Sequence, residues 1–282
     1  GNRMYDPTED YGGYHNQHLV RGPQFAHSYE MHEKGHGFLF PKYAGDREAV
    51  VNLPHVAVMN VGWGLTFDQA LRSSRSITNE FATLETTAIA WMLSDHFVGD
   101  GVMQGYERQY QLKGHAKFVD VARLFGWEAL GRFWKAGHQA HMDGNPWPKN
   151  SAGEEGDVYT VNLFKAAGAD LRPLIHFWGI PIVNEERTDT MIAEANIQPS
   201  AKVYDLLMSY KRAIPADNAA FREYALNWWG KQPSPEGYTT QRNHAARWDS
   251  YDEAEAKKVA ATVQAIIDKY FPEGRPADTN DD

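Results

Sequence analysis

The 282-residue sequence predicts a mainly α-helical protein with little β structure. Three observations support this prediction. Apolar residues recur at helical spacing along most of the chain, clusters such as Asp143-Gly144-Asn145-Pro146 separate the periodic runs, and strand signals are few. A hydrophobic fraction of 42% is enough for a substantial core, in one large domain or in two lobes.

The predicted helices follow these runs in chain order. The first begins after Pro23 and ends where Gly37 can act as a C-terminal cap. The second opens at Glu48 with an apolar run, and the last has an amphipathic stripe from Val259 to Tyr270. The predicted ranges are 26–37, 48–59, 77–97, 103–112, 115–124, 127–139, 158–167, 170–177, 200–211, 217–229 and 252–271.

Four regions are expected along the chain. Residues 1–25 form an N-terminal extension, a candidate remnant of an upstream lobe, and residues 26–250 form the helical domain. Residues 251–271 form a packing helix at the C-terminal end. Residues 272–282 are polar and are expected to fray.

Composition excludes several functions. A net charge of -9 and the absence of a basic run argue against a nucleic-acid partner. No apolar run reaches the roughly 18 residues that a membrane helix needs, so no membrane span is expected. The chain has no cysteine, which leaves histidine and carboxylate side chains as its strong zinc ligands.

One pentapeptide carries a metal-binding pattern. The sequence His32-Glu33-Lys34-Gly35-His36 fits HExxH, in which a helical turn presents two histidines on one face as zinc ligands. Glu33 would lie beside the metal and take a proton from a zinc-bound water with a pKa of about 7. This is the chemistry of a metallopeptidase. The alternative is a surface helix with two unrelated histidines.

A catalytic zinc site needs a third protein ligand, and Glu48 is the nearest candidate. It opens an apolar run, where a carboxylate is costly to bury unless it is paired or metal-bound; a first-turn acid favoured by the helix dipole is the alternative. Asn52 lies one turn further on the same face, where it is a candidate to contact a metal ligand or the substrate. His55 is a second candidate for such a contact, or else a core histidine. Glu80 is the second candidate for the third ligand.

Other side chains are candidates for roles at the site. His138 and His141, followed by Asp143, are either a second metal pair or part of a solvated loop, and the loop is favoured. Tyr159 and His176 are candidates for stabilising the oxyanion of the tetrahedral intermediate.

The segments His32–His36, Gly45 and Glu48–Leu53 together resemble the enhancin-like family of gluzincin zinc metallopeptidases. That family has HExxH, a short spacer, and a glutamate that opens a helix with an asparagine four residues later. Later segments, at residues 110–112, 124–130, 170–175 and 178–181, look like the helical lobe of the family.

The resemblance implies a zincin-like helical catalytic lobe, with Zn²⁺ held by His32, His36 and Glu48 and with Glu33 as the general base. It also implies a protein or glycoprotein substrate, often mucin-type, and a secreted or cell-surface location. Lys34 departs from the family, which commonly has an apolar residue there. Only 31 residues precede His32, too few for an upstream substrate-binding sheet, so the chain is expected to be a fragment or to hold its substrate differently.

Two alternatives to the peptidase remain open. A non-catalytic glycan- or protein-binding module could use the same helical scaffold. A zinc hydrolase that acts on something other than peptides would have the same motif.

Overall fold

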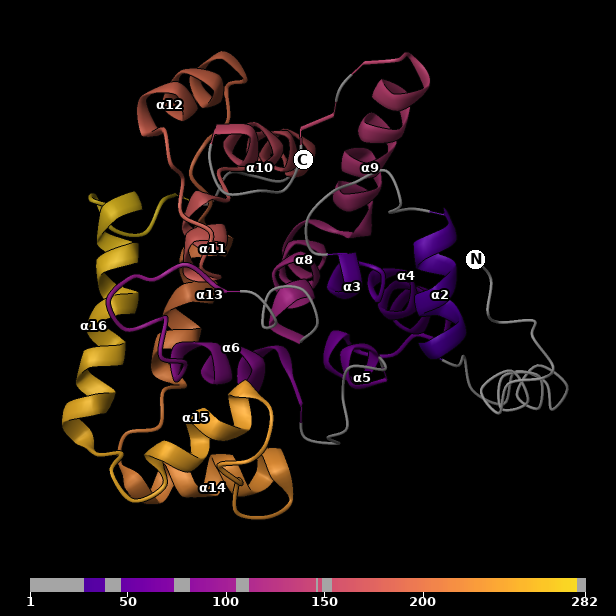
Figure 1. The fold of residues 1–282 in the computed structure, drawn as a ribbon. Helices are drawn as coiled ribbons and strands as arrows, with labels where there is room; N and C mark the ends of the chain where they lie inside the picture. The colour runs from indigo at the N-terminus through magenta and orange to yellow at the C-terminus, as the bar shows by residue number, and fades with distance from the viewer. Residues whose placement is uncertain are drawn as a thin grey trace, which may run out of the picture.

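The computed structural model describes residues 28–38, 47–73, 82–104, 112–145, 147–148 and 154–277. These residues form a mainly helical structure (Figure 1), as the sequence predicts. The elements are α2 (Ser28–Phe38), α3 (Arg47–Val50), α4 (Leu53–Ala57), the π-helix η2 (Val58–Gly62), α5 (Phe67–Arg72), α6 (Leu84–Met92), α8 (Leu112–Phe125), α9 (Trp127–Met142), α10 (Glu154–Ala167), α11 (Arg172–Phe177), α12 (Glu185–Glu194), α13 (Ala201–Arg212), α14 (Asn218–Trp229), α15 (Thr239–Arg247) and α16 (Glu253–Tyr270).

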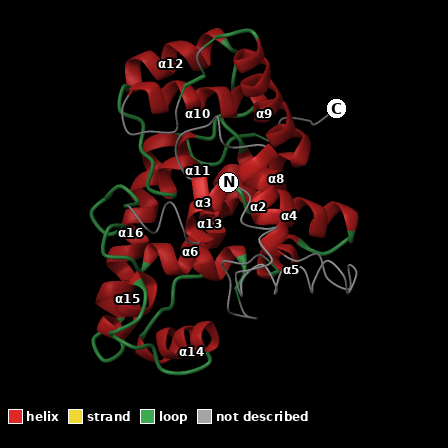
Figure 2. Cartoon of the chain, turned by 45° about the vertical axis from the view of Figure 1, so that its right-hand side comes forward, coloured by secondary structure: helices red, strands yellow, loops and turns green. Residues whose placement is uncertain are grey.

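Strands play no part in the described ranges. Figure 2 shows helices joined by loops, and the pairing of Asp170 with Pro199 is an isolated bridge. Within the same ranges, no helix is both long and apolar enough to cross a bilayer.

Helix α8 lies at the centre of the fold and positions the elements around it. It packs against α3, α4, α5, α6 and α9. Helices α11, α13 and α16 pack on one another, on the left in Figure 1. The predicted stripe on α16 is buried there, at Val259, Val263, Ile266 and Ile267. The hydrophobic core extends from Val50 to Phe271.

A buried carboxylate connects α8 with α13 and with the residue that follows α11. Asp120 accepts hydrogen bonds from the Trp178 indole at 3.0 Å and from the Tyr210 hydroxyl at 2.8 Å, and it pairs with Arg123 at 3.0 Å. Burial raises the pKa of Asp120 to about 6, although Arg123 and the hydrogen bonds oppose the increase.

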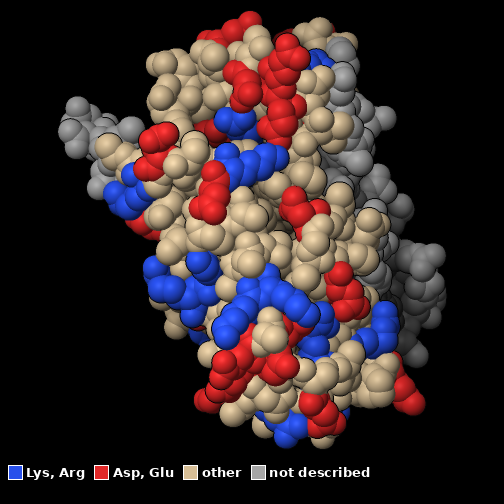
Figure 3. Space-filling model, turned by 90° about the vertical axis from the view of Figure 1, so that its left-hand side faces the viewer, with Lys and Arg blue, Asp and Glu red and all other residues tan. Residues whose placement is uncertain are grey.

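Surface charges of both signs are mixed. On the face shown in Figure 3, Lys and Arg side chains lie among Asp and Glu side chains. The exposed ion pairs of the described residues include Arg222 with Asp249, Lys269 with Glu185, and Arg275 with Asp205. Exposed pairs of this kind contribute little to stability, so the buried core dominates.

A buried histidine predicts how stability changes with pH. His244 accepts a hydrogen bond at Nδ1 from the Trp229 indole at 2.8 Å, and burial lowers its pKa from 6.5 to about 3. Between these values the unfolded chain takes up a proton that the folded chain does not, so the free energy of unfolding falls as pH falls. Asp120 has the opposite effect between pH 3.8 and about 6. There the folded chain holds a proton that the unfolded chain does not, so this carboxyl makes the free energy of unfolding rise as pH falls.

We therefore expect His244→Gln to reduce the slope of the unfolding free energy against pH between pH 6.5 and 4. The reduction corresponds to about one proton, because glutamine does not titrate. Glutamine can still accept the indole hydrogen bond. Urea unfolding at several pH values measures this slope. The exposed Gln198→Asn variant removes no ionisable group, so it is the control and should keep the wild-type slope. Equal slopes in all three proteins would contradict the assignment to His244.

Candidate metal centre

A glycine allows α2 to lie directly against the segment that follows α3. A Cβ atom built at Gly35 would lie 2.5 Å from the Val51 carbonyl oxygen and 2.9 Å from the Val51 Cβ. Real Cβ atoms do not approach backbone this closely, so glycine is required at this position if the two segments are to touch. Gly37, the predicted C-terminal cap, also lies inside α2, which ends at Phe38.

The predicted helix 48–59 is wrong as a continuous element. It is broken at Val51–Asn52 into α3 and α4, and the chain continues as η2 to Gly62. Pro54 lies in the first turn of α4, where its missing N–H does least harm. The Asn52 side-chain amide compensates for the break, since it donates to the carbonyl oxygens of Glu48 at 3.0 Å and Ala49 at 3.1 Å.

Three predicted ligand atoms converge between α2 and α3. The Nε2 atoms of His32 and His36 are 3.2 Å apart, and each lies 3.3 Å from Oε2 of Glu48. Among the described residues, these three side chains are the group of histidine and acidic ligands that could hold a metal ion. The structure therefore brings together His32, His36 and Glu48, from two helices.

The spacing of these atoms fits zinc. Two ligand atoms about 2.0–2.1 Å from a tetrahedral zinc ion lie about 3.3–3.4 Å from each other. All three separations in the cluster are close to this value. The side chains of His36 and Glu48 are 27% and 31% exposed, so the cluster is open on one side. Catalytic zinc sites have this form, with three protein ligands and one open position.

Asn52 sets the tautomer of His32. Because the Asn52 amide nitrogen donates to two carbonyl groups, its Oδ1 atom faces His32 Nδ1 as an acceptor, at 3.0 Å. The proton of the imidazole is then on Nδ1, and Nε2 presents a lone pair to the cluster. Burial lowers the pKa of His32, and this outweighs the opposing effects of Asn52, Glu33 and Glu48. His32 is therefore a neutral imidazole near pH 7, the form that binds a metal.

We expect Asn52→Ala to weaken zinc binding by about 10- to 100-fold, because His32 would lose the partner that fixes its ring and its tautomer. Competition with a fluorescent zinc chelator measures the affinity. Asn60→Ala is the matched control: Asn60 accepts from the Trp127 indole and donates to the Leu65 carbonyl oxygen, outside the cluster. An equal loss of zinc affinity in both variants would show that the effect comes from general destabilisation and not from the contact with His32.

His55 contacts a different partner. Its Nε2 atom is 2.8 Å from the Ser73 hydroxyl, which itself donates to the Ala70 carbonyl oxygen and so accepts from the imidazole. The side chain is fully buried, and burial lowers its pKa to about 4. His55 connects α4 to α5 as a core histidine and takes no part in the three-atom cluster.

The two oxyanion candidates also lie outside the cluster. Tyr159 packs edge-on against Phe133 in the core. His176 belongs to α11, and its Nδ1 atom is 3.0 Å from the hydroxyl of Tyr270 on α16, while Asp100 is 2.6 Å from its Nε2 atom.

The other residues singled out in the sequence lie outside the cluster or outside the described residues. His138, His141 and Asp143 are exposed at the end of α9 and form no metal-binding group with other described residues. Glu80 lies outside the described residues, as do the predicted N-terminal extension and most of the predicted helix 103–112. Lys34 is exposed, as its polar character suggests.

Comparison of the chain with protein-family models, with curated proteins and with solved structures finds no match.

Proposed function

We propose that this chain is a zinc-dependent metallopeptidase, in which His32, His36 and Glu48 hold Zn²⁺ and Glu33 is the general base. The observation that carries the proposal is the convergence of two imidazole nitrogens and one carboxylate oxygen at 3.2–3.3 Å from one another. The cluster includes both histidines of an HExxH helix, and this motif supplies a glutamate next to the first ligand.

Zinc, when bound, lowers the pKa of a water molecule to about 7 and polarises the carbonyl group of the substrate. Glu33 follows His32 on α2, and we assign to it the proton transfers: it accepts the proton of the attacking water and delivers it to the leaving amine. Burial keeps His32 neutral, and the contact with Asn52 fixes the tautomer that turns Nε2 toward the cluster. The exposed side of His36 and Glu48 leaves room for the substrate.

The proposed substrate is a protein or glycoprotein, with mucin-like glycoproteins first, and the proposed location is outside the cell. Both follow from the resemblance of the motif and its spacer to the enhancin-like gluzincins. The competing proposal is a glycan- or protein-binding module without catalysis. The presence of Glu33 beside three ligand side chains favours the enzyme, since binding alone would not need a base.

Incubation of the zinc-loaded protein with a mucin-type glycoprotein, and with the same protein after deglycosylation, tests the proposal. We expect new N-termini in the mass spectrum, their loss on treatment with a zinc chelator, and their return when zinc is added back. A preparation that holds zinc, binds the glycoprotein and produces no new termini would favour the binding module instead.

A further inference from the structure

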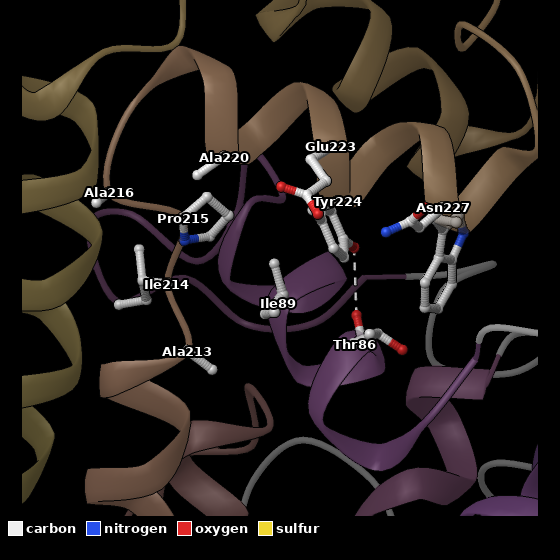
Figure 4. Close-up of a pocket in the computed structure, with 11 residues that line it drawn as sticks. Thr86, Ile89, Ala213, Ile214, Pro215, Ala216, Ala220, Glu223, Tyr224 and Asn227 are labelled. Atoms are coloured by element: carbon white, nitrogen blue, oxygen red, sulfur yellow. Dashed lines mark hydrogen bonds between the residues drawn. The ribbon is translucent and has the colours of Figure 1, made fainter.

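A second site lies away from the metal centre, where α6, α14 and the loop before α14 meet. The structure has a pocket of about 380 Å³ at this place (Figure 4). None of its lining residues belongs to α2 or α3, which carry the candidate zinc ligands. Its apolar wall is formed by Ile89 of α6, by Ile214 and Pro215 of the loop, and by Ala220 of α14.

Two polar side chains of α14 face this wall. Glu223 and Asn227 are one helical turn apart and both line the pocket (Figure 4). Both are exposed to solvent, and neither forms a hydrogen bond or an ion pair with another described side chain. A carboxylate and an amide oxygen beside an apolar wall can both accept hydrogen bonds from a cationic group.

The neighbouring arginine does not neutralise this carboxylate. Arg222 is turned the other way, where it pairs with Asp249 at 2.5 Å, donates to the Trp248 carbonyl oxygen at 2.9 Å, and lies over the Trp248 ring. The negative charge of Glu223 is therefore available to a ligand.

Aromatic rings complete the pocket. The Tyr224 hydroxyl donates to the Thr86 carbonyl oxygen at 3.2 Å, which fixes its ring between α14 and α6 (Figure 4). Trp228 lies one turn further along α14 and also lines the pocket. Aromatic faces attract cations and pack well against methylene groups.

We propose that this pocket binds the side chain of a lysine or arginine residue of a polypeptide. The aliphatic stem packs against the apolar wall, and the cationic end meets Glu223 and Asn227. Apolar ligands do not use the carboxylate, and anionic ligands are repelled by it. The proposal does not depend on the metal centre.

Calorimetric titration with N-acetyl-arginine methylamide and N-acetyl-lysine methylamide tests this proposal. The matched control ligand is N-acetyl-citrulline methylamide, which has nearly the same shape as the arginine ligand but no charge. We expect it to bind at least about tenfold more weakly than the arginine ligand, because a hydrogen bond to a charged group contributes more than one between neutral groups. Methylguanidine, which has the cationic group of arginine but not its aliphatic stem, should also bind more weakly than the arginine ligand.

The variant Glu223→Gln should weaken the binding of both cationic ligands at least about tenfold. The matched control is Glu194→Gln, which makes the same change in net charge at an exposed position at the end of α12 and should leave the binding unchanged. Equal binding of arginine and citrulline ligands, equal losses in the two variants, or no binding to the wild-type protein would each overturn the proposal.

Discussion

Replacing Glu33 with glutamine is expected to reduce peptide hydrolysis by about 10²- to 10⁴-fold while zinc remains bound. Glutamine has nearly the same shape as glutamate but cannot accept the proton of the attacking water. The three proposed ligand side chains do not include Glu33, so the zinc content should stay within about twofold of the wild-type value. The kcat on a peptide substrate and the zinc content of the same preparation measure both quantities.

The control for this variant is Glu186→Gln, which removes one negative charge from an exposed position at the start of α12. We expect it to keep both zinc and activity. An active Glu33→Gln protein would show that another group acts as the base. A Glu33→Gln protein without zinc would show that Glu33 is needed for zinc binding.

The second large effect is expected from Gly35→Ala. The added Cβ atom would meet the backbone of Val51, so α2 must move away from the segment that carries Glu48 and Asn52. Overpacking of this kind costs about 1–3 kcal/mol of unfolding free energy, and the movement would separate the ligand atoms. We therefore expect lower stability and zinc affinity reduced by at least about tenfold, the factor that 1.4 kcal/mol represents.

Gly131→Ala provides a matched control for this substitution. Gly131 lies within α9, and a Cβ atom built there meets nothing within 4 Å. In a helix, alanine is favoured over glycine by about 0.5–1 kcal/mol, so this variant should be slightly more stable than the wild type. If Gly35→Ala were also stabilising and kept its zinc, the close approach of α2 to Val51 would not matter for the site.

The sequence was a good guide where hydrophobic periodicity is strong. The predicted helices 115–124, 127–139, 200–211, 217–229 and 252–271 match α8, α9, α13, α14 and α16 within a few residues. Short helices were missed because they have few turns over which a period can be seen. Three described helices, α5, α12 and α15, are of this kind.

Capping signals could have identified two of the missed helices. Thr66 and Gln69 form a capping box at the start of α5, and the Asn184 side chain caps α12 by accepting from the Arg187 amide. Both patterns are readable in the sequence as a polar residue just before an acidic first turn. Periodicity alone does not detect them.

At the metal centre, local patterns predicted the residue types and the fold supplied their arrangement. The four-residue spacing of His32 and His36 places both on one face of any helix. The position of Glu48 depends on the contact between Gly35 and Val51 and on the break at Asn52, and neither can be derived from the spacing of the ligands. His55 shows the limit of spacing arguments, because its Ser73 partner directly follows a separate helix, α5.

Elemental analysis of bound zinc is the measurement that tests the central claim most directly. It should be made on the wild-type protein and on the Glu48→Ala and Glu80→Ala variants, each loaded with zinc and then freed of excess metal. We expect about one zinc per chain in the wild type and in Glu80→Ala, and a large loss in Glu48→Ala. Zinc retained by Glu48→Ala, or absent from the wild type, would contradict the site formed by His32, His36 and Glu48.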